Sequence, residues 1–247
     1  MAIKTHLNYS PNFNPIKRKT NQIKFIIFHY TGMRSESAAI KRLMNINAKV
    51  SCHYLIKNNG QIIKLVPDLY ISWHAGTSSW KNYISLNNNS IGIEISNPGH
   101  SFDYKKFSKS QILSLIKLSR FLIKKYKINS KNVLGHSDIA PERKKDPGEK
   151  FPWRYLSKKK IGFWHKLDQK RLFKNRDLKN EDLKEKLFYK NLFKIGYSKK
   201  IPKNSNIKKI KYMRIITKAF QRRFRPELIN GKIDQECFII SENLVKN

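Results

Sequence analysis

Acidic residues are scarce in this chain of 247 residues, because 17 Asp and Glu stand against 52 Lys and Arg. The resulting formal charge of +35 favours any polyanion, including nucleic acid, acidic lipid head groups and an anionic cell wall. Much of the excess is Lys beside Asn and Ile, a mixture that we expect from an AT-rich genome. The charge therefore does not by itself assign a partner.

Cysteine is also rare. The two cysteines, Cys52 and Cys237, lie in different halves of the chain and form no CxxC pair. This spacing supports neither a disulfide framework nor a thiolate zinc cluster. Cys52 stands in an apolar segment, residues 52–56, so we expect it to be a buried core residue.

Long apolar runs are missing as well. No segment reaches the roughly 18 apolar residues of a membrane-spanning helix, and residues 1–21 lack the apolar stretch of a secretory signal. We therefore expect no membrane span and, by default, a cytoplasmic location.

Short apolar runs are present, and over the first two-thirds of the chain they alternate with amphipathic stretches. This alternation predicts an α/β fold, a mixed central sheet with helices packed on it. Residues 23–30 and 90–96 are predicted strands, and residues 132–135 form a shorter one. Residues 52–57 and 62–66 flank Asn58-Asn59-Gly60-Gln61, where Asn-Gly supplies positive φ angles, and so predict a β-hairpin.

Two helices are predicted by their first residues. Ser35 is a plausible N-cap for residues 35–47, whose apolar side chains share one helical face. Ser108, with Gln111 three residues later, predicts a capped helix that runs to about residue 127.

The composition changes after Leu156. Residues 157–182 are rich in Lys, Arg and Asn and predict a basic linker, partly helical. Beyond it, Ile216, Phe220 and Phe224 recur at helical spacing before Pro226 and Gly231, which predicts a small helical domain. The predicted division is an N-terminal extension (1–22), an α/β domain (23–156), a linker (157–182) and a helical domain (183–247).

The strongest candidate for chemistry is the polar loop 136–148, which directly follows a short predicted strand. It begins with His136, and His29 likewise ends an apolar strand. Two imidazoles and one carboxylate suit Zn²⁺ and leave a fourth position for water. The residues alone do not choose the set, since other histidines are available and one aspartate competes with Asp146. The competitors are His53, His74, His100 and Asp138.

Five segments, in order along residues 23–156, resemble the amidase type 2 family of N-acetylmuramoyl-L-alanine amidases, which is similar to peptidoglycan recognition proteins and phage amidase lysozymes. The segments are Phe28-His29-Tyr30-Thr31, Ser51-Cys52-His53-Tyr54-Leu55-Ile56, Trp73-His74-Ala75-Gly76, Ser90-Ile91-Gly92-Ile93-Glu94-Ile95 and the loop 136–148. The resemblance implies zinc-dependent hydrolysis of the amide between N-acetylmuramic acid, or its 1,6-anhydro form, and L-alanine. It implies His29, His136 and Asp146 as the zinc ligands.

Two further residues are predicted to take part in catalysis. Glu94 is a lone carboxylate in an apolar strand, where it is costly unless it faces a polar site, so it is the predicted general base. The alternative is a structural Glu in a salt bridge. Lys144 lies two residues before Asp146, on the same side of an extended backbone, where the family places a lysine. It is predicted to stabilise the oxyanion.

Other residues near these segments are predicted to bind substrate. The resemblance places His74 and Trp73 at the groove, and the alternative for Trp73 is core packing. Tyr30 stands beside a predicted ligand, and Arg143 is a candidate for substrate carboxylates, as is Lys145. His53 lies inside a strand and is expected to be structural.

The C-terminal residues 219–226 and 230–234 resemble a peptidoglycan-binding domain, with Cys237 where that pattern usually has Thr. We therefore expect peptidoglycan or a muropeptide as substrate and a monomeric enzyme, located in the envelope if this domain binds wall. Two alternatives remain open: a recognition module without metal or catalysis, and a nucleic-acid-binding protein. No nucleic-acid motif accompanies the charge, so no nucleic-acid partner is expected.

Overall fold

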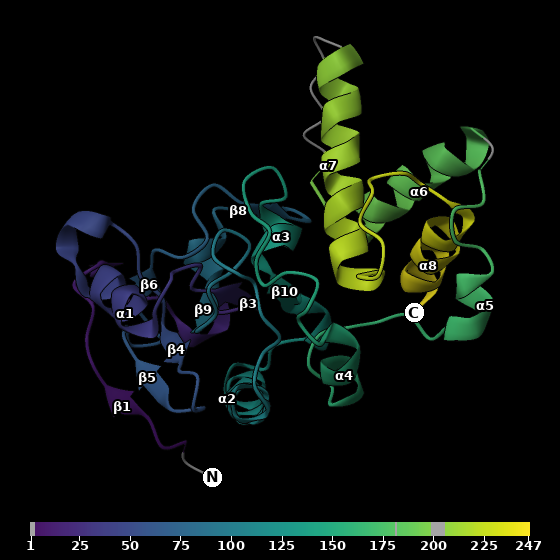
Figure 1. Cartoon of the computed structure of the whole chain (residues 1–247). Coiled ribbons are helices and arrows are strands. Elements are labelled where there is room, and N and C mark those ends of the chain that lie inside the picture. Colours follow the sequence, from purple (N-terminus) through teal and green to yellow (C-terminus); the bar gives the residue numbers. More distant parts are fainter. Residues whose placement is uncertain (1–2, 181, 199–205) are drawn as a thin grey trace.

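The computed structural model describes residues 3–180, 182–198 and 206–247. Its central sheet contains β1 (His6–Leu7), β3 (Phe25–Tyr30), β4 (Tyr54–Ile56), β5 (Ile62–Lys64), β9 (Ser90–Ile95) and β10 (Val133–Gly135). The strand order is β1-β5-β4-β9-β3-β10 (Figure 1). The β4–β5 pair is antiparallel, whereas the other neighbours pair in parallel. The predicted mixed sheet is confirmed, including the strands expected at residues 23–30, 90–96 and 132–135.

Two small antiparallel pairs lie beside this sheet. They are formed by β2 (Phe13–Asn14) with β6 (Ile71–Ser72), and by β7 (Ser79–Trp80) with β8 (Tyr83–Ile84). Residues 6–14, inside the predicted extension 1–22, thus supply an edge strand of the main sheet and one strand of a small pair. The boundary of this extension as a separate segment stays a prediction.

Helices cover both faces of the sheet. They are α1 (Glu36–Met44), α2 (Lys109–Tyr126), α3 (His136–Ile139), α4 (Trp153–Lys158), α5 (Gln169–Phe173), α6 (Asp182–Ile195), α7 (Asn206–Phe224) and α8 (Gln235–Lys246). Short 3₁₀ turns are η1 (Thr20–Gln22), η2 (Ile46–Ala48), η3 (Leu86–Asn89) and η4 (Ser130–Asn132). Within the described ranges, none of the helices has the length and apolar character needed to cross a bilayer.

Local sequence signals explain where two helices begin. The Ser35 hydroxyl accepts a hydrogen bond from the Ala38 backbone N–H at 3.1 Å, as its predicted N-cap role requires. Ser108 and Gln111 form the predicted capping box at the start of α2, each accepting from the other's backbone N–H. Both caps satisfy donors that the first helical turn leaves unpaired.

The predicted hairpin is formed by β4 and β5, but its turn differs from the expectation in one respect. Gly60 adopts φ of +87°, whereas Asn59 is not among the residues with positive φ. The Gly60 N–H donates to the Lys57 carbonyl, and the Lys57 N–H donates to the Gln61 carbonyl. The loop is longer than two residues, so a single left-handed position after the turn is enough to reverse the chain.

The alternation of side chains along β3 separates two cores. Ile26 and Phe28 face the core that contains α2 and α4, while Phe25 and Ile27 face the opposite core. This follows from the two-residue period of a strand. His29, the next residue, therefore points to the same face as Phe25 and Ile27.

The C-terminal helices complete that second core. Phe188 of α6, Phe220 of α7 and Ile240 of α8 belong to one continuous apolar cluster with Phe25 and Ile27. Burial of each such side chain contributes roughly 1.5–3 kcal/mol. Figure 1 shows α6, α7 and α8 grouped together beside α3 and β10. The division at a linker stays a prediction, and within residues 157–182 Ile161 and Leu172 are buried.

Candidate active site

A cavity of about 440 Å³ opens where β3, β9 and β10 end. Since these strands run parallel, the residues at their carboxyl ends meet at one edge of the sheet. The residues that line this cavity include Tyr30, Glu94, His136 and Asp146. A larger cavity of about 1370 Å³ lies among α6, α7 and the loop before α8, and its lining includes none of the predicted metal or catalytic residues. Chemistry rather than size therefore singles out the smaller cavity.

His29, His136 and Asp146 converge at this cavity, which His136 and Asp146 line. The Nδ1 atoms of the two histidines are 2.9 Å apart, and each lies 3.0 Å from Asp146 Oδ2. All three side chains are buried. The three predicted ligands thus present one nitrogen or oxygen each to a common point, an arrangement that can hold a metal ion.

The far side of each histidine ring is held by the segment that contains His74 and Ala75. His29 Nε2 lies 3.0 Å from His74 Nδ1, and His136 Nε2 lies 3.1 Å from the Ala75 carbonyl oxygen. Both bonds are satisfied when each Nε2 carries the proton, which leaves both Nδ1 lone pairs free to bind a cation. His74 Nε2 then donates to Ser90 Oγ at 3.1 Å.

Electrostatics favour neutral imidazoles at His29 and His74 beside a charged carboxylate at Asp146. Burial, followed by the proximity of His136, lowers the pKa of His29 to about 4. Burial, followed by the proximity of His29, lowers the pKa of His74 well below its usual range. Burial would raise the pKa of Asp146, but the two histidines, His136 foremost, hold it well below its usual range. Neutral nitrogen and ionised oxygen are the forms that bind metals.

Gly92 makes room for His74. A Cβ atom at position 92 would lie 2.4 Å from His74 Cγ, far inside van der Waals contact. Gly92 lies on β9, directly opposite Ile27 of β3, so its bare Cα faces the side of the sheet that carries His29. The glycine therefore allows the His74 ring to reach His29.

Glu94 and Lys144 line the same cavity. Glu94 is the register partner of His29 on the adjacent parallel strand. Its Oε2 atom is buried and has no hydrogen-bond partner among the described residues. Burial, and next the Asp146 charge, raise the pKa of Glu94 well above its usual range, while Lys144 opposes that shift. The structural alternative, a Glu in a salt bridge, finds no support in the ion pairs of the described residues.

The predicted substrate-binding residues lie in different surroundings. Tyr30 and Arg143 line the cavity of the metal residues, but Arg143 also donates to the carbonyls of Ala75 and Thr77. His74 touches the same cavity, with both ring nitrogens bonded to protein groups. Trp73 is 37% exposed, which argues against core packing, and it lines a separate cavity of about 390 Å³. Their roles toward substrate stay predictions.

The competitors for the metal site are engaged elsewhere. Asp138 forms a buried ion pair with Arg223. His53 is buried, and its Nδ1 accepts from the Gly92 N–H at 3.0 Å, as expected for a structural residue. The sequence left Asp138 and Asp146 as alternatives, and the structure brings Asp146 to the two histidines.

His100 lines the cavity and Glu149 bonds to it, and the sequence assigned neither a catalytic nor a substrate-binding role, although His100 was a competitor for the metal site. His100 Nδ1 lies 2.9 Å from the Tyr30 hydroxyl, and His100 Nε2 lies 3.0 Å from Glu149 Oε2. Each follows a Pro-Gly pair whose glycine has a positive φ, Gly99 at +69° and Gly148 at +86°. In the sequence, the position of each residue directly after a Pro-Gly turn is the signal that could have found them. This signal does not indicate that the two turns lie close together in the fold.

Comparisons with known proteins agree with this geometry. A family model described as N-acetylmuramoyl-L-alanine amidase matches residues 19–149. The chain is 34% identical to N-acetylmuramoyl-L-alanine amidase AmiD of Escherichia coli over 238 residues, which cover 91% of this chain and 83% of AmiD. It is 40% identical to 1,6-anhydro-N-acetylmuramyl-L-alanine amidase AmpD of Escherichia coli over 105 residues, 42% of this chain and 55% of AmpD.

Solved structures are similar over most of the chain. E. coli AmiD in complex with the substrate anhydro-N-acetylmuramic acid-L-Ala-D-γ-Glu-L-Lys matches with a TM-score of 0.78 at 34% identity, over 91% of this chain and 89% of AmiD. AmpDH3 of Pseudomonas aeruginosa in complex with anhydromuramic pentapeptide matches with a TM-score of 0.77 at 31% identity, over 94% of this chain and 93% of AmpDH3. The likeness thus extends over the C-terminal helices as well as the sheet.

Proposed function

The chain belongs to the N-acetylmuramoyl-L-alanine amidase family, and from this premise we propose that it hydrolyses the amide between N-acetylmuramic acid, or its 1,6-anhydro form, and L-alanine, with Zn²⁺ as its metal. The observation that carries the proposal is the convergence of His29, His136 and Asp146 within 3.0 Å in a cavity that also contains Glu94.

The donor set fits zinc. Two neutral imidazole nitrogens and one carboxylate oxygen are typical of catalytic zinc sites, which keep a further position open. The bonds from His29 Nε2 to His74 and from His136 Nε2 to Ala75 fix the ring orientations, as outer partners do in such sites. His29, His136 and Asp146 would hold the ion.

The reaction replaces the C–N bond of the amide by a C–O bond from water. When bound, Zn²⁺ supplies Lewis-acid chemistry, which lowers the pKa of water and polarises the amide carbonyl. Glu94 accepts the proton that water loses on attack and returns a proton to the nitrogen of L-alanine as that amine departs. The Lys144 ammonium donates a hydrogen bond to the carbonyl oxygen as it becomes negative.

The substrate that we propose is a muropeptide, with the 1,6-anhydro form included. The support is that AmiD and AmpDH3 are similar over almost the whole chain and were solved with anhydromuramyl peptides. Wall binding by the C-terminal helices is part of the same proposal, and the cavity of about 1370 Å³ there offers space for a ligand. The cytoplasmic location and the monomeric state stay predictions.

Metal analysis and turnover of a defined muropeptide test the proposal together. The protein should contain about one zinc per chain and should release the peptide from anhydro-N-acetylmuramic acid-L-Ala-D-γ-Glu-L-Lys, as followed by mass spectrometry. Parallel assays on insoluble sacculi measure whether intact wall is also cut. A protein that binds the muropeptide without zinc and without turnover would contradict the proposal.

A further inference from the structure

The metal-ligand loop is held by a buried contact from the C-terminal helices. Asp138 lies two residues after His136 in α3, and its Oδ2 forms an ion pair with Nη1 of Arg223, which belongs to α7. Both side chains are only 1% exposed. A charge buried to this degree is costly unless it is paired, so the two groups depend on each other.

Two aromatic rings and one backbone carbonyl hold the guanidinium of Arg223 in addition to Asp138. Its guanidinium lies 4.0 Å from the centre of the Trp153 ring and 4.5 Å from that of Phe163. Its Nη2 donates to the Val133 carbonyl of β10 at 3.2 Å. The planar guanidinium stacks on these rings and binds a carboxylate in a fixed geometry at the same time. The position of Asp138 is therefore set by groups that do not move independently.

A second C-terminal residue contacts the same carboxylate. Tyr197 lies between α6 and α7 in the sequence. Its hydroxyl donates a hydrogen bond to Asp138 Oδ1 at 3.1 Å. Burial, and next the Asp138 charge, raise the pKa of Tyr197 well above its usual range, so the hydroxyl stays a donor. Asp138 thus receives bonds at both oxygens from the C-terminal part of the chain.

Asp138 transmits this restraint to both sides of the metal site. Its Oδ2 accepts from the Gly135 backbone N–H at 2.8 Å, immediately before His136. The Ser137 N–H donates to the Asp146 carbonyl at 2.8 Å, which ties the α3 turn to the other ligand of the loop. A shift of α3 would therefore move His136 and Asp146 together.

We propose that Arg223 and Tyr197 are positioning residues of the metal site, acting through Asp138 on the turn that carries His136. The C-terminal helices are then a structural part of the catalytic centre, in addition to any wall contact. This inference rests on the proposed metal site, and it concerns no residue that touches substrate.

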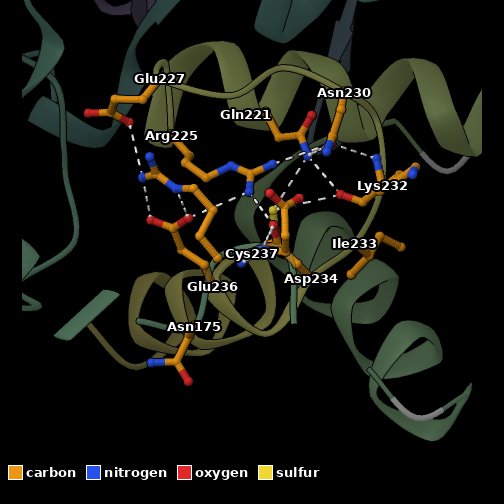
Figure 2. Close-up of polar contacts among 12 residues, drawn as sticks. Asn175, Gln221, Arg225, Glu227, Asn230, Lys232, Ile233, Asp234, Glu236 and Cys237 are labelled. Atoms are coloured by element: carbon orange, nitrogen blue, oxygen red, sulfur yellow. Dashed lines mark hydrogen bonds and ion pairs between the residues drawn. The ribbon is translucent and has the colours of Figure 1, made fainter. Parts of the chain in front are cut away.

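A matched arginine separates this role from simple packing. Arg225 lies two residues further on, is 1% exposed and pairs with the buried carboxylates of Asp234 and Glu236. Figure 2 shows that its partners come from the C-terminal segment itself, with Asp234 and Glu236 facing its guanidinium. Both arginines bind buried carboxylates, but that of Arg223 belongs to the metal-ligand turn.

The experiment compares Arg223→Met with Arg225→Met in the full chain. Both variants lose a buried ion pair and should melt at lower temperature. Well below those melting temperatures, Arg223→Met should bind Zn²⁺ at least about tenfold more weakly in chelator competition and should change the visible spectrum of the Co²⁺-substituted protein. Arg225→Met should keep wild-type affinity and spectrum. Arg223→Lys should recover part of the affinity, because it retains the charge.

Two milder substitutions, in Tyr197 and Tyr212, test the inference if Arg223→Met does not fold. Tyr197→Phe removes the hydroxyl that bonds Asp138, whereas Tyr212→Phe removes a hydroxyl that donates to the Ser198 carbonyl at 2.9 Å. Tyr197→Phe should weaken Zn²⁺ binding severalfold, and Tyr212→Phe should leave it unchanged. Wild-type zinc affinity and Co²⁺ spectrum in folded Arg223→Met, or in Tyr197→Phe where Arg223→Met does not fold, would overturn the inference. Absence of zinc from the wild-type protein would instead refute the proposed function.

Discussion

Glu94 lies directly opposite His29 in the parallel register of β9 and β3. Register partners on parallel strands point to the same face, so the predicted base and a predicted ligand emerge side by side at one edge of the sheet. Ile93 and Ile95, on either side of Glu94, point into the core that contains α2. A slip of one residue would bury Glu94 in that core and turn an isoleucine toward the cavity.

Glu94→Gln should separate metal binding from turnover. The substitution keeps the size of the side chain but removes the carboxylate that accepts a proton, so kcat should fall by about 10²–10⁴-fold. Zinc content, measured by mass spectrometry of the metal, should remain at the wild-type level, since Glu94 is not a predicted ligand. A Glu94→Gln enzyme with undiminished kcat would remove Glu94 from the mechanism.

His29→Ala, His136→Ala and Asp146→Asn should each lose zinc and turnover together. Each change removes one of three donors that lie within 3.0 Å of one another. A chelator should likewise abolish activity in the wild-type protein, and added Zn²⁺ should restore it. Asp68→Asn is the control, because it alters a buried carboxylate outside the cavity. Full zinc occupancy in Asp146→Asn would exclude Asp146 as a ligand.

Gly92→Ala should weaken the metal site without altering a polar group. The added Cβ would lie 2.4 Å from His74 Cγ, so the ring must move away from His29 Nε2. Overpacking of this kind costs about 1–3 kcal/mol of unfolding free energy, and a displaced outer partner lowers metal affinity by about 10–100-fold. Chelator competition and thermal melts measure the two effects.

Gly60→Ala provides the comparison for Gly92→Ala. Position 60 has φ of +87°, and an added Cβ would lie 2.8 Å from the Ser110 carbonyl oxygen, so this variant should also lose stability. Gly60 lies in the β4–β5 turn and does not line the cavity, and zinc affinity should be unchanged. Equal losses of affinity in both variants would argue against a specific role for the contact between Gly92 and His74.

Asp68 should make folding stability depend on acid pH. Burial would raise the pKa of this carboxyl, but hydrogen bonds from Tyr126, Tyr54 and Lys125 hold it well below its usual range. The distances from these donors to the carboxylate are 2.6, 2.5 and 2.9 Å. Because the folded pKa lies below the unfolded value of about 3.9, the contribution is complete above about pH 5 and is lost as pH falls through the folded pKa.

Asp68→Asn should therefore lower the free energy of unfolding at pH 7 by on the order of 2–3 kcal/mol. Urea denaturation between pH 7 and pH 3 should show a shallower decline for the variant than for the wild type. Parallel curves for the two proteins over that range would show that Asp68 is not responsible for acid sensitivity.

Local features of the fold were predictable because local physics determines them. Ser35 and Ser108 cap helices through hydroxyls that reach backbone N–H groups three residues on, and Gly60 permits the left-handed turn of the hairpin. The turn was less predictable in detail, since loop length decided that Asn59 need not adopt a positive φ. Periodicity likewise predicted strands, but two-residue alternation alone does not say which face meets which helix.

Selection of the site residues needed more than spacing. His29 and His136 end predicted strands, yet Asp138 and Asp146 were equivalent by pattern until family order favoured Asp146. The structure gives the physical reason, because Asp138 faces Arg223 of α7 and Tyr197 of the segment between α6 and α7. Arg223 lies 85 residues after Asp138 in the chain, and no local signal in the loop points to it.

The sequence by itself determined the mixed α/β class, the existence of the main strands, the start of the helices at Ser35 and Ser108, and the order of segments in which His29, Glu94, His136 and Asp146 stand. Tertiary structure decided the register that pairs Glu94 with His29, the Gly92 gap that admits His74, and the contact of α7 with the metal-ligand turn. The physical reason is range: caps, turns and periodicity act over a few residues, whereas a buried ion pair and a strand register depend on which distant segments pack together.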